Sequence, residues 1–232
     1  MPSNKEKTSS VIPTPFAKSA AKAAAHLSKI DPDLGRVIKA TGPVLLVPDE
    51  ARTPFYALLR AIAHQQLSGR AAETIMGRFH DLFPNVPHPT PEQVLAVEDL
   101  VLRGVGFSRP KISYIKDLAA RALSGAVPTH DEILNLTDEE LIERLTAIKG
   151  IGRWTVEMLL IFKLGRMDVL PIHDLGIQKG FMITYRKRKL PKPETILKFG
   201  ERWRPYRTIA SWYLWRAVDL AANKDRKWWE EV

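Results

Sequence analysis

The chain contains no cysteine among its 232 residues. Disulfide bonds, thiolate zinc sites, iron–sulfur clusters and cysteine nucleophiles are therefore excluded. The chain also lacks an apolar run of the ~18–20 residues that a membrane-spanning helix needs. Its first 25 residues contain no apolar core of a signal peptide. We therefore expect an intracellular protein with no membrane association.

Acidic residues are outnumbered by basic ones. Lys and Arg total 35 against 26 Asp and Glu, which gives a net charge of +9. This excess favours a polyanionic partner, although a protein that is merely basic is the alternative. The 6 histidines show no spacing typical of a zinc site. We read residues 1–25 as a basic, flexible tail and residues 26–232 as the folded domain.

Strand signals are scarce, and only "VLLVP" at 44–48 resembles a strand. Helix signals recur along the rest of the chain, because capping residues, several of them followed by proline or by a capping-box residue, precede apolar residues at helical spacing. Such starts stand at Thr53, Ser68, Thr90, Ser108 and Thr137, and prolines at 193 and 205 begin two more helices. The sequence therefore predicts an all-α fold built from short helices.

A helix–turn–helix pattern covers about residues 138–164 and includes "LIERLTAIKGIGRWTVEMLL". Gly150 and Gly152 permit positive φ and a close approach of the backbone to a partner. The N–H groups that begin the helix at Arg153 lie at the positive end of its dipole, where they can bind a phosphate. Lys149 and Arg153 flank the turn. The alternative is an ordinary corner between two helices.

A single acid, Asp174, follows this hairpin within "LPIHDLGIQKG" and stands where a new helix is expected. A carboxylate at a helix N-terminus is stabilised in its ionised form. Such an anion can act as a cap worth about 1 kcal/mol. It can equally face a sugar that becomes an oxocarbenium ion, and both roles need the ionised form.

The hairpin, the apolar helix and the Pro-x-x-Asp resemble the helix-hairpin-helix DNA glycosylase superfamily, nearest to its alkylation-repair branch, the 3-methyladenine DNA glycosylases of bacterial and yeast type. Three further segments carry the resemblance: "LLRAIAHQQLSGRAAETI", "GVGFSRPKISYIKDLA" and "WRPYRTIASWYLWRAVD". It implies two helical subdomains with a cleft between them and with the N- and C-terminal helices packed together. It also implies the compact form, which lacks an N-terminal β domain.

The resemblance implies an enzyme that flips a damaged nucleotide out of double-stranded DNA and hydrolyses its N-glycosidic bond. The expected partner is duplex DNA that contains alkylated bases, and the expected state is a monomer. We expect it in the cytoplasm, or in the nucleus of a eukaryote. No cofactor is expected for catalysis.

By the same resemblance, Asp174 is the catalytic carboxylate. It either stabilises the oxocarbenium ion or positions and deprotonates water. Trp154 stands where lyase-competent relatives carry a lysine nucleophile, which implies a monofunctional glycosylase. Trp154 and Trp215 match pocket aromatics that can hold a cationic purine, with core packing as the alternative. Met158 departs from the tyrosine of the bacterial type, and His173 is expected to support the turn.

By the same resemblance, Gln65 and Gln66 match the loop whose side chain fills the gap left by a flipped base. Gln66 is the candidate wedge, and its neighbours at the minor groove are Gln65, Leu67 and His64. Ser68 and Arg70 are candidates for phosphate contacts, and so are Lys149, Gly150, Gly152 and Arg153. The family hairpin can also hold Na⁺ or K⁺ with main-chain carbonyls, which here would be those of Thr146, Ile148 and Ile151.

Three other readings stay open. A non-catalytic DNA-binding protein could use the same hairpin to recognise damage. A glycosylase for oxidised or mismatched bases is disfavoured by Trp154 and by the absence of cysteine. A helical protein-interaction domain is disfavoured by the positive charge. The preferred base among 3-methyladenine, 7-methylguanine, 1-methyladenine, hypoxanthine and ethenoadenine is not determined.

Overall fold

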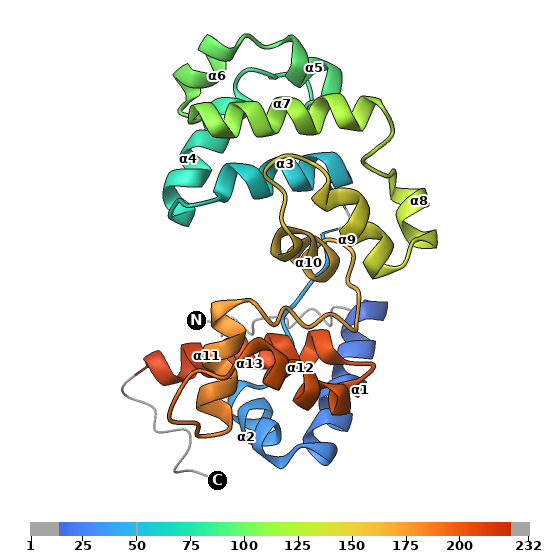
Figure 1. The fold of residues 1–232 in the computed structure, drawn as a ribbon, viewed down its shortest axis with the longest axis vertical. Helices are drawn as coiled ribbons and strands as arrows, with labels where there is room; N and C mark the ends of the chain where they lie inside the picture. Colours follow the sequence, from blue (N-terminus) through green and yellow to red (C-terminus); the bar gives the residue numbers. More distant parts are fainter. Residues whose placement is uncertain (1–13, 50, 224–232) are drawn as a thin grey trace, which may run out of the picture. The chain divides into compact units, whose positions relative to one another are not determined.

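A computed structural model describes residues 14–49 and 51–223, and within these ranges the chain forms helices and no strand (Figure 1). The prediction of an all-α fold is confirmed, and "VLLVP" at 44–48 is irregular backbone. The helices are α1 (Pro15–Ile30), α2 (Pro32–Thr41), α3 (Pro54–His64), α4 (Gly69–His80), α5 (Pro91–Ala96), α6 (Asp99–Val105), α7 (Arg109–Leu123), α8 (His130–Asn135), α9 (Asp138–Thr146), α10 (Arg153–Phe162), α11 (Leu175–Thr184), α12 (Pro193–Gly200), the 3₁₀ turn η1 (Glu201–Trp203) and α13 (Arg207–Ala222).

The helix starts predicted at Thr53, Ser68, Thr90, Ser108 and Thr137 are formed by the expected caps, whereas α12 and α13 have no side-chain cap. The side chains of Thr53, Ser68 and Ser108 each accept a bond from a backbone N–H in the first turn of the helix that follows. Thr90 and Thr137 form complete capping boxes with Gln93 and Glu140. These bonds satisfy N–H groups that have no partner within a helix.

The expectation of a flexible tail over residues 1–25 is wrong for its second half. Helix α1 begins at Pro15, and Thr14 caps it by accepting the N–H of Ala17 at 3.2 Å. Ala20, Ala23 and Ala24 are buried on one face of the helix. Alanine spaced in this way gives a small apolar face that packs closely, although the composition alone suggested disorder. Residues 1–13 lie outside the described part of the chain.

The described chain divides into two compact units. Unit 2, Pro48–Asp174, is continuous in sequence. Within it α3 packs against α4, α7 and α10, while α7 also contacts α5 and α6, and α9 packs on α10. Figure 1 shows α7 lying across α3. Helix α3 is therefore central to this unit, and its C-terminal end leads directly into the segment predicted to carry the wedge.

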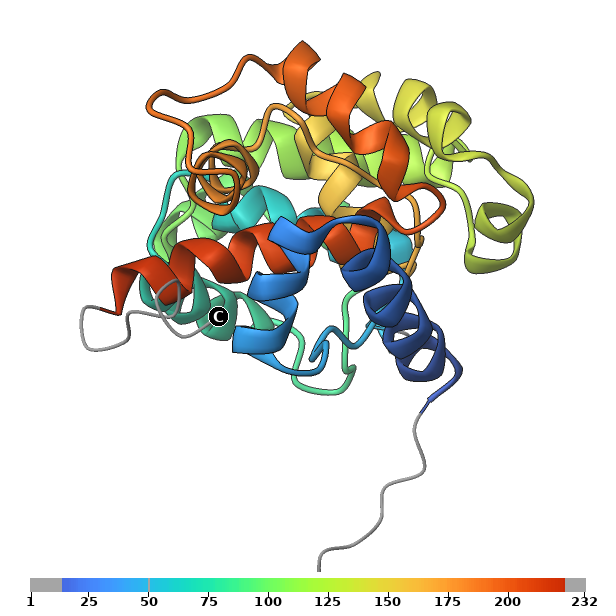
Figure 2. The ribbon, with the colours of Figure 1, turned by 90° about the horizontal axis from the view of Figure 1, so that it is seen from below.

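Among the described residues, unit 1 combines residues 14–47 with residues 175–223. Helices α11 and α13 pack most extensively, and α2 and α1 both contact α13 (Figure 2). The contact between α11 and α13 is close at Gly180, where a Cβ atom would overlap the main-chain carbonyl of Leu214.

Unit 1 also contains a buried carboxylate. Asp31 is only 3% exposed and accepts bonds from the Tyr185 hydroxyl at 2.7 Å and the Trp203 indole N–H at 2.9 Å. It also accepts the N–H of Leu34 at 3.1 Å and so caps α2. One side chain from the first part of the sequence thus anchors two aromatic residues from the last part.

Candidate nucleic-acid and base-excision site

The predicted hairpin is formed by α9 and α10 and the six residues between them. Gly150 has a φ of +81°, a conformation that glycine adopts without strain. A side chain there would overlap the ring of Tyr114, so glycine is needed both for the turn and for this contact. Gly152 precedes α10, and no atom lies within 4 Å of the position of a Cβ there, so the turn is open on that side.

The donors of the hairpin divide into those that are engaged and those that point outward. The backbone N–H of Lys149 donates to Asp117 Oδ2 at 2.9 Å, and the Arg153 guanidinium pairs with Glu139 at 2.8 Å and with Glu157 at 3.1 Å. In contrast, no side chain caps the first turn of α10. The N–H of Thr155 already donates to the carbonyl of Gly152 at 2.9 Å, so the N–H groups of Arg153 and Trp154 are the donors left for an anion.

The wedge segment is held against the hairpin. Gln65 Nε2 donates to the carbonyl of Gly150 at 2.9 Å. The next residue, Gln66, is exposed and has a φ of +57°, which is rare for a residue other than glycine. Ser68 then caps α4, because its Oγ accepts the N–H of Ala71 at 3.3 Å. The segment is thus fixed on both sides of Gln66, and Leu67 is 40% exposed beside it.

Lys111 supports the same segment, and sequence reasoning missed it. Its Nζ is buried and donates at 2.7 Å to the carbonyl of Ala63, in the last turn of α3. Burial lowers the pKa of this ammonium. A cation at a helix C-terminus is favourable, but the contact joins residues 48 positions apart in the sequence. No local pattern identifies such a pair.

A cavity of about 440 Å³ lies beside the wedge segment and is lined by Ala61, His64, Gln65, Gln66, Trp154, Thr155 and Met158. Its volume falls in the range of about 300–1,000 Å³ that is common for small-molecule sites. Four of its lining residues also line a neighbouring cavity of about 270 Å³. The structure therefore brings the predicted pocket residues Trp154 and Met158 together with the predicted wedge residues.

Asp174 is linked to this cavity through Trp154, which lines it. The indole Nε1 of Trp154 donates to Asp174 Oδ2 at 2.7 Å. Trp154 itself is 47% exposed, which is unusual for so large an apolar side chain. Asp174 immediately precedes α11, and its own N–H donates to the carbonyl of Pro171 at 3.0 Å. The hydrogen bond to Trp154 holds one carboxylate oxygen and orients the indole ring.

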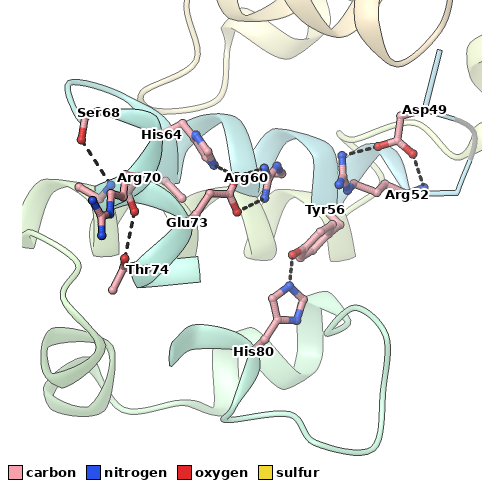
Figure 3. A network of polar contacts seen from close by, with 12 residues as sticks. Asp49, Arg52, Tyr56, Arg60, His64, Ser68, Arg70, Glu73, Thr74 and His80 are labelled. Atoms are coloured by element: carbon pink, nitrogen blue, oxygen red, sulfur yellow. Dashed lines mark hydrogen bonds and ion pairs between the residues drawn. The ribbon is translucent and has the colours of Figure 1, made fainter. Parts of the chain in front are cut away.

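His64 belongs to a polar network on α3 and α4 (Figure 3). Glu73 pairs with Arg60 and lies 3.5 Å from His64 Nε2. Burial and the charge of Arg60 together lower the pKa of His64, and the Glu73 carboxylate only partly opposes them. We therefore consider the imidazole neutral at physiological pH, so that it faces the cavity as a polar but uncharged group.

The remaining residues predicted for the site do not line the cavity. Arg70 is exposed in the first turn of α4, and His173 is exposed beside Asp174. Trp215 is half-buried on α13 in unit 1, so its part in the pocket stays a prediction. Among the three proposed carbonyls, that of Ile148 already accepts the N–H of Ile151 at 3.1 Å. A carbonyl oxygen has a second lone pair, so this bond does not prevent cation binding.

Comparison with known proteins shows the family. The model of the HhH-GPD superfamily of base excision DNA repair proteins matches residues 59–205, which include the hairpin and Asp174. DNA-3-methyladenine glycosylase 1 of Schizosaccharomyces pombe is 45% identical over 206 residues, covering 88% of this chain and 90% of that protein.

Solved structures agree with this assignment. The S. pombe 3-methyladenine DNA glycosylase Mag1, in complex with abasic DNA, matches with a TM-score of 0.77, covering 86% of this chain and 98% of that one at 45% identity. A DNA-3-methyladenine glycosidase from Bacillus halodurans matches with a TM-score of 0.78 and 36% identity, covering 91% and 92%. No helix in the described ranges is long and apolar enough to cross a membrane. By sequence and by structure, this chain belongs to the HhH-GPD superfamily of base excision DNA repair proteins.

Proposed function

We propose that this chain is a monofunctional DNA glycosylase that removes alkylated purines from double-stranded DNA. The observation that carries the proposal is the 2.7 Å hydrogen bond between Trp154 and Asp174 at the edge of the cavity. It places an aromatic surface and a carboxylate together, and these are the two groups that excision of a cationic base needs. Relatives whose names describe 3-methyladenine glycosylases support the choice of substrate.

The chemistry follows from the charge of the substrate. A purine alkylated at N3 or N7 is cationic, and the face of an indole attracts a cation by about 0.5–2 kcal/mol. The same charge makes the base a good leaving group, so that no general acid is required. As the glycosidic bond breaks, the sugar becomes an oxocarbenium ion, and the Asp174 carboxylate stabilises it and orients the attacking water. The base leaves as a neutral molecule, water supplies the new sugar hydroxyl, and the remaining proton of that water passes by way of Asp174 to solvent.

Trp154 also explains why we propose no lyase reaction. A glycosylase that cleaves the DNA backbone uses a lysine amine to form an imine with the sugar. Trp154 has no nucleophilic nitrogen, and its N–H is engaged by Asp174. Hydrolysis by water is then the only outcome that these groups support, and the product is an abasic site.

The hairpin and the wedge segment complete the proposed DNA contacts. The N–H groups at the start of α10, with the open turn at Gly152, would bind a backbone phosphate. Lys149, Arg70 and the hydroxyl of Ser68 would contact neighbouring phosphates. Gln66 would enter the duplex where the flipped base has left, and Gln65 and His64 would lie beside it at the minor groove.

Further parts of the proposal concern the hairpin ion and the assembly. The carbonyls of Thr146, Ile148 and Ile151 are the groups that would hold Na⁺ or K⁺, because hard cations prefer oxygen ligands. Such an ion would add positive charge beside the phosphate. We also propose that the protein acts on DNA inside the cell as a monomer.

The test is base release from methylated duplex DNA under single-turnover conditions, with wild type, Asp174→Asn and the exposed control Asp81→Asn compared side by side. We expect Asp174→Asn to lose at least about 10²-fold, the usual scale for one catalytic group, while duplex binding and the control are unchanged. Release within threefold of wild type would disprove the role of Asp174. Binding of damaged DNA by wild type without any release would instead indicate a non-catalytic damage-recognition protein, and a stable borohydride cross-link would contradict hydrolysis by water.

A further inference from the structure

A second feature of the surface lies in unit 1, in the connection between α11 and α12. Five of the seven residues from 186 to 192, hereafter the basic loop, are cationic: Arg186, Lys187, Arg188, Lys189 and Lys192. The other two are Leu190 and Pro191, so that the loop contains no acid. All five cationic residues are exposed.

The two arginines of the basic loop differ from most other arginines of the described chain in how their charges are balanced. Most arginines elsewhere in residues 14–49 and 51–223 form ion pairs with carboxylates, as seen for Arg36, Arg52, Arg60, Arg121, Arg153, Arg166, Arg204, Arg207 and Arg216. None of the five cations of the basic loop has a carboxylate partner among the described residues. Like charges this close in sequence repel one another, so the folded chain alone gives no reason for the cluster.

The backbone of the basic loop is nevertheless well fixed at its start. Arg186 adopts a φ of +52°, and the N–H of Lys187 donates to the carbonyl of Met182 at 2.8 Å, as in the αL ends of helices. The preceding residue, Tyr185, is anchored through its hydroxyl to the buried carboxylate of Asp31 at 2.7 Å. Its ring also packs against Phe181 and Phe199, with centroid distances of 4.5 and 4.6 Å. The loop is therefore presented by a rigid base, which reduces the ordering cost of binding.

We propose that the basic loop is a second DNA-binding surface, which contacts the phosphates of duplex DNA regardless of damage. The unpaired cations are suited to a partner with regularly spaced negative charges, and duplex DNA carries one charge per ~1.7 Å of its axis. Contacts of this kind position a protein without reading bases. They also raise the rate of association and allow the protein to remain on undamaged DNA while it searches.

The chain offers a matched control for the test. The loop variant replaces Arg186, Lys187, Arg188 and Lys189 by Gln. The control replaces Lys18, Lys22, Lys29 and Lys39 by Gln; these are four exposed lysines on α1 and α2 of the same unit. Both variants lose four positive charges, so they differ only in where the charge is lost. Circular dichroism and thermal melting establish that both are folded.

The measurement is the affinity for an undamaged duplex as a function of salt, near 0.1 M, where charges more than ~10 Å apart are screened. Each phosphate contact contributes ~0.9 to the slope of log K against log salt, so the loop variant should lose about 2–4 from the slope and at least about tenfold in affinity. The control should stay within about threefold. Base release by saturating enzyme in a single turnover should be unchanged in both variants.

Two results would overturn the proposal. Equal losses in the two variants would show that net charge matters and not the loop. Unchanged duplex binding in the loop variant, with lost binding to vesicles of anionic lipid or to single-stranded RNA, would assign the loop to that other partner. The binding measurement uses undamaged DNA and needs no catalysis, so it stands whether or not the wild-type protein releases bases.

Discussion

Each of the two units contains a hydrogen bond from an indole N–H to an aspartate, and the two bonds have different roles. In unit 1, Trp203 donates to Asp31 at 2.9 Å, and both residues are almost fully buried. In unit 2, Trp154 donates to Asp174 at 2.7 Å, but the tryptophan is 47% exposed. The buried pair can serve only the fold, whereas the exposed pair presents the aromatic face of Trp154 to a ligand. The chemistry of a pair thus does not determine its role until its burial is known.

The largest effect on unit 1 should come from its closest helix contact. In Gly180→Ala, the new methyl group would overlap the carbonyl of Leu214, so α11 and α13 must separate. We predict a loss of about 3 kcal/mol or more in the free energy of unfolding, measured by urea denaturation. Gly77→Ala in α4 of unit 2 is the control, because nothing lies within 4 Å of its Cβ. It should stabilise the protein by about 0.5–1 kcal/mol. Equal effects would mean that the helix contact tolerates expansion.

The second prediction is that Asp31 matters for stability and Asp174 for base release. Asp31→Ala leaves the Tyr185 hydroxyl and the Trp203 indole without their acceptor inside the protein. We expect this to cost about 2–4 kcal/mol of stability, with little change in base release by the protein that remains folded. Asp174→Ala should change stability by less than about 1 kcal/mol, since an exposed hydrogen bond contributes little, and should abolish release. Thermal melting and single-turnover release on both variants would check this, and the comparison fails if the two profiles coincide.

The third prediction concerns the segment that joins the wedge to the hairpin. Gln66→Ala should slow release from duplex DNA by about tenfold, which is ~1.4 kcal/mol of the few kcal/mol that flipping costs. Single-stranded substrate, which needs no wedge, should be unaffected. Gln65→Ala should give the same pattern and also lower the melting temperature, because it removes the bond to the Gly150 carbonyl. Equal losses on duplex and single strand would show that Gln66 shapes the pocket and is not the wedge.

The smallest effect should appear as a dependence of stability on pH within unit 2. His88 stacks on Tyr56 with a centroid distance of 4.0 Å, and burial is the main cause that lowers the pKa of its imidazole. The folded state therefore favours the neutral ring, so this contribution to stability is complete above pH 6.5, the ordinary pKa, and is lost as the pH falls below it.

The variant His88→Phe keeps the stacked ring but cannot titrate. We predict that its melting temperature falls less than that of wild type between about pH 7.5 and 5.5. The exposed His130 provides the control, and His130→Gln should follow the wild-type curve. If His88→Phe also followed that curve, protonation of His88 would not limit stability in acid.

The sequence alone predicts those features of the structure that depend on residues close together in the chain. The caps at Thr53, Thr90 and Thr137 were predicted because each involves residues three positions apart. The hairpin and Asp174 are recognisable because the family resemblance depends on their order along the chain. The same local reasoning fails at α1, where the composition predicts a flexible tail although Ala20, Ala23 and Ala24 are buried in unit 1.

Contacts between distant residues were not predictable in this way. The bond from Gln65 to Gly150 spans 85 positions, and the bond from Tyr185 to Asp31 spans 154. Gln65 was recognised by its resemblance to the wedge segment, but its function as a tether depends on where the hairpin lies. The burial of Lys111 and Asp31 also ran against expectation, because charged residues are rarely buried unless they are paired. Their partners are backbone groups and aromatic side chains that carry no signal in the sequence.

The composition of unit 1 from both ends of the chain has a consequence for biosynthesis. Unit 2 is continuous, so all of its helices exist as soon as Asp174 has emerged from the ribosome. Helices α1 and α2 leave the ribosome earlier, but the aromatic partners of Asp31 are Tyr185 and Trp203, which are made only after the whole of unit 2. Because domains tend to fold as units in the order of their synthesis, the first two helices must wait while unit 2 folds. During that interval the apolar face of α1 and the carboxylate of Asp31 are exposed to solvent and to chaperones.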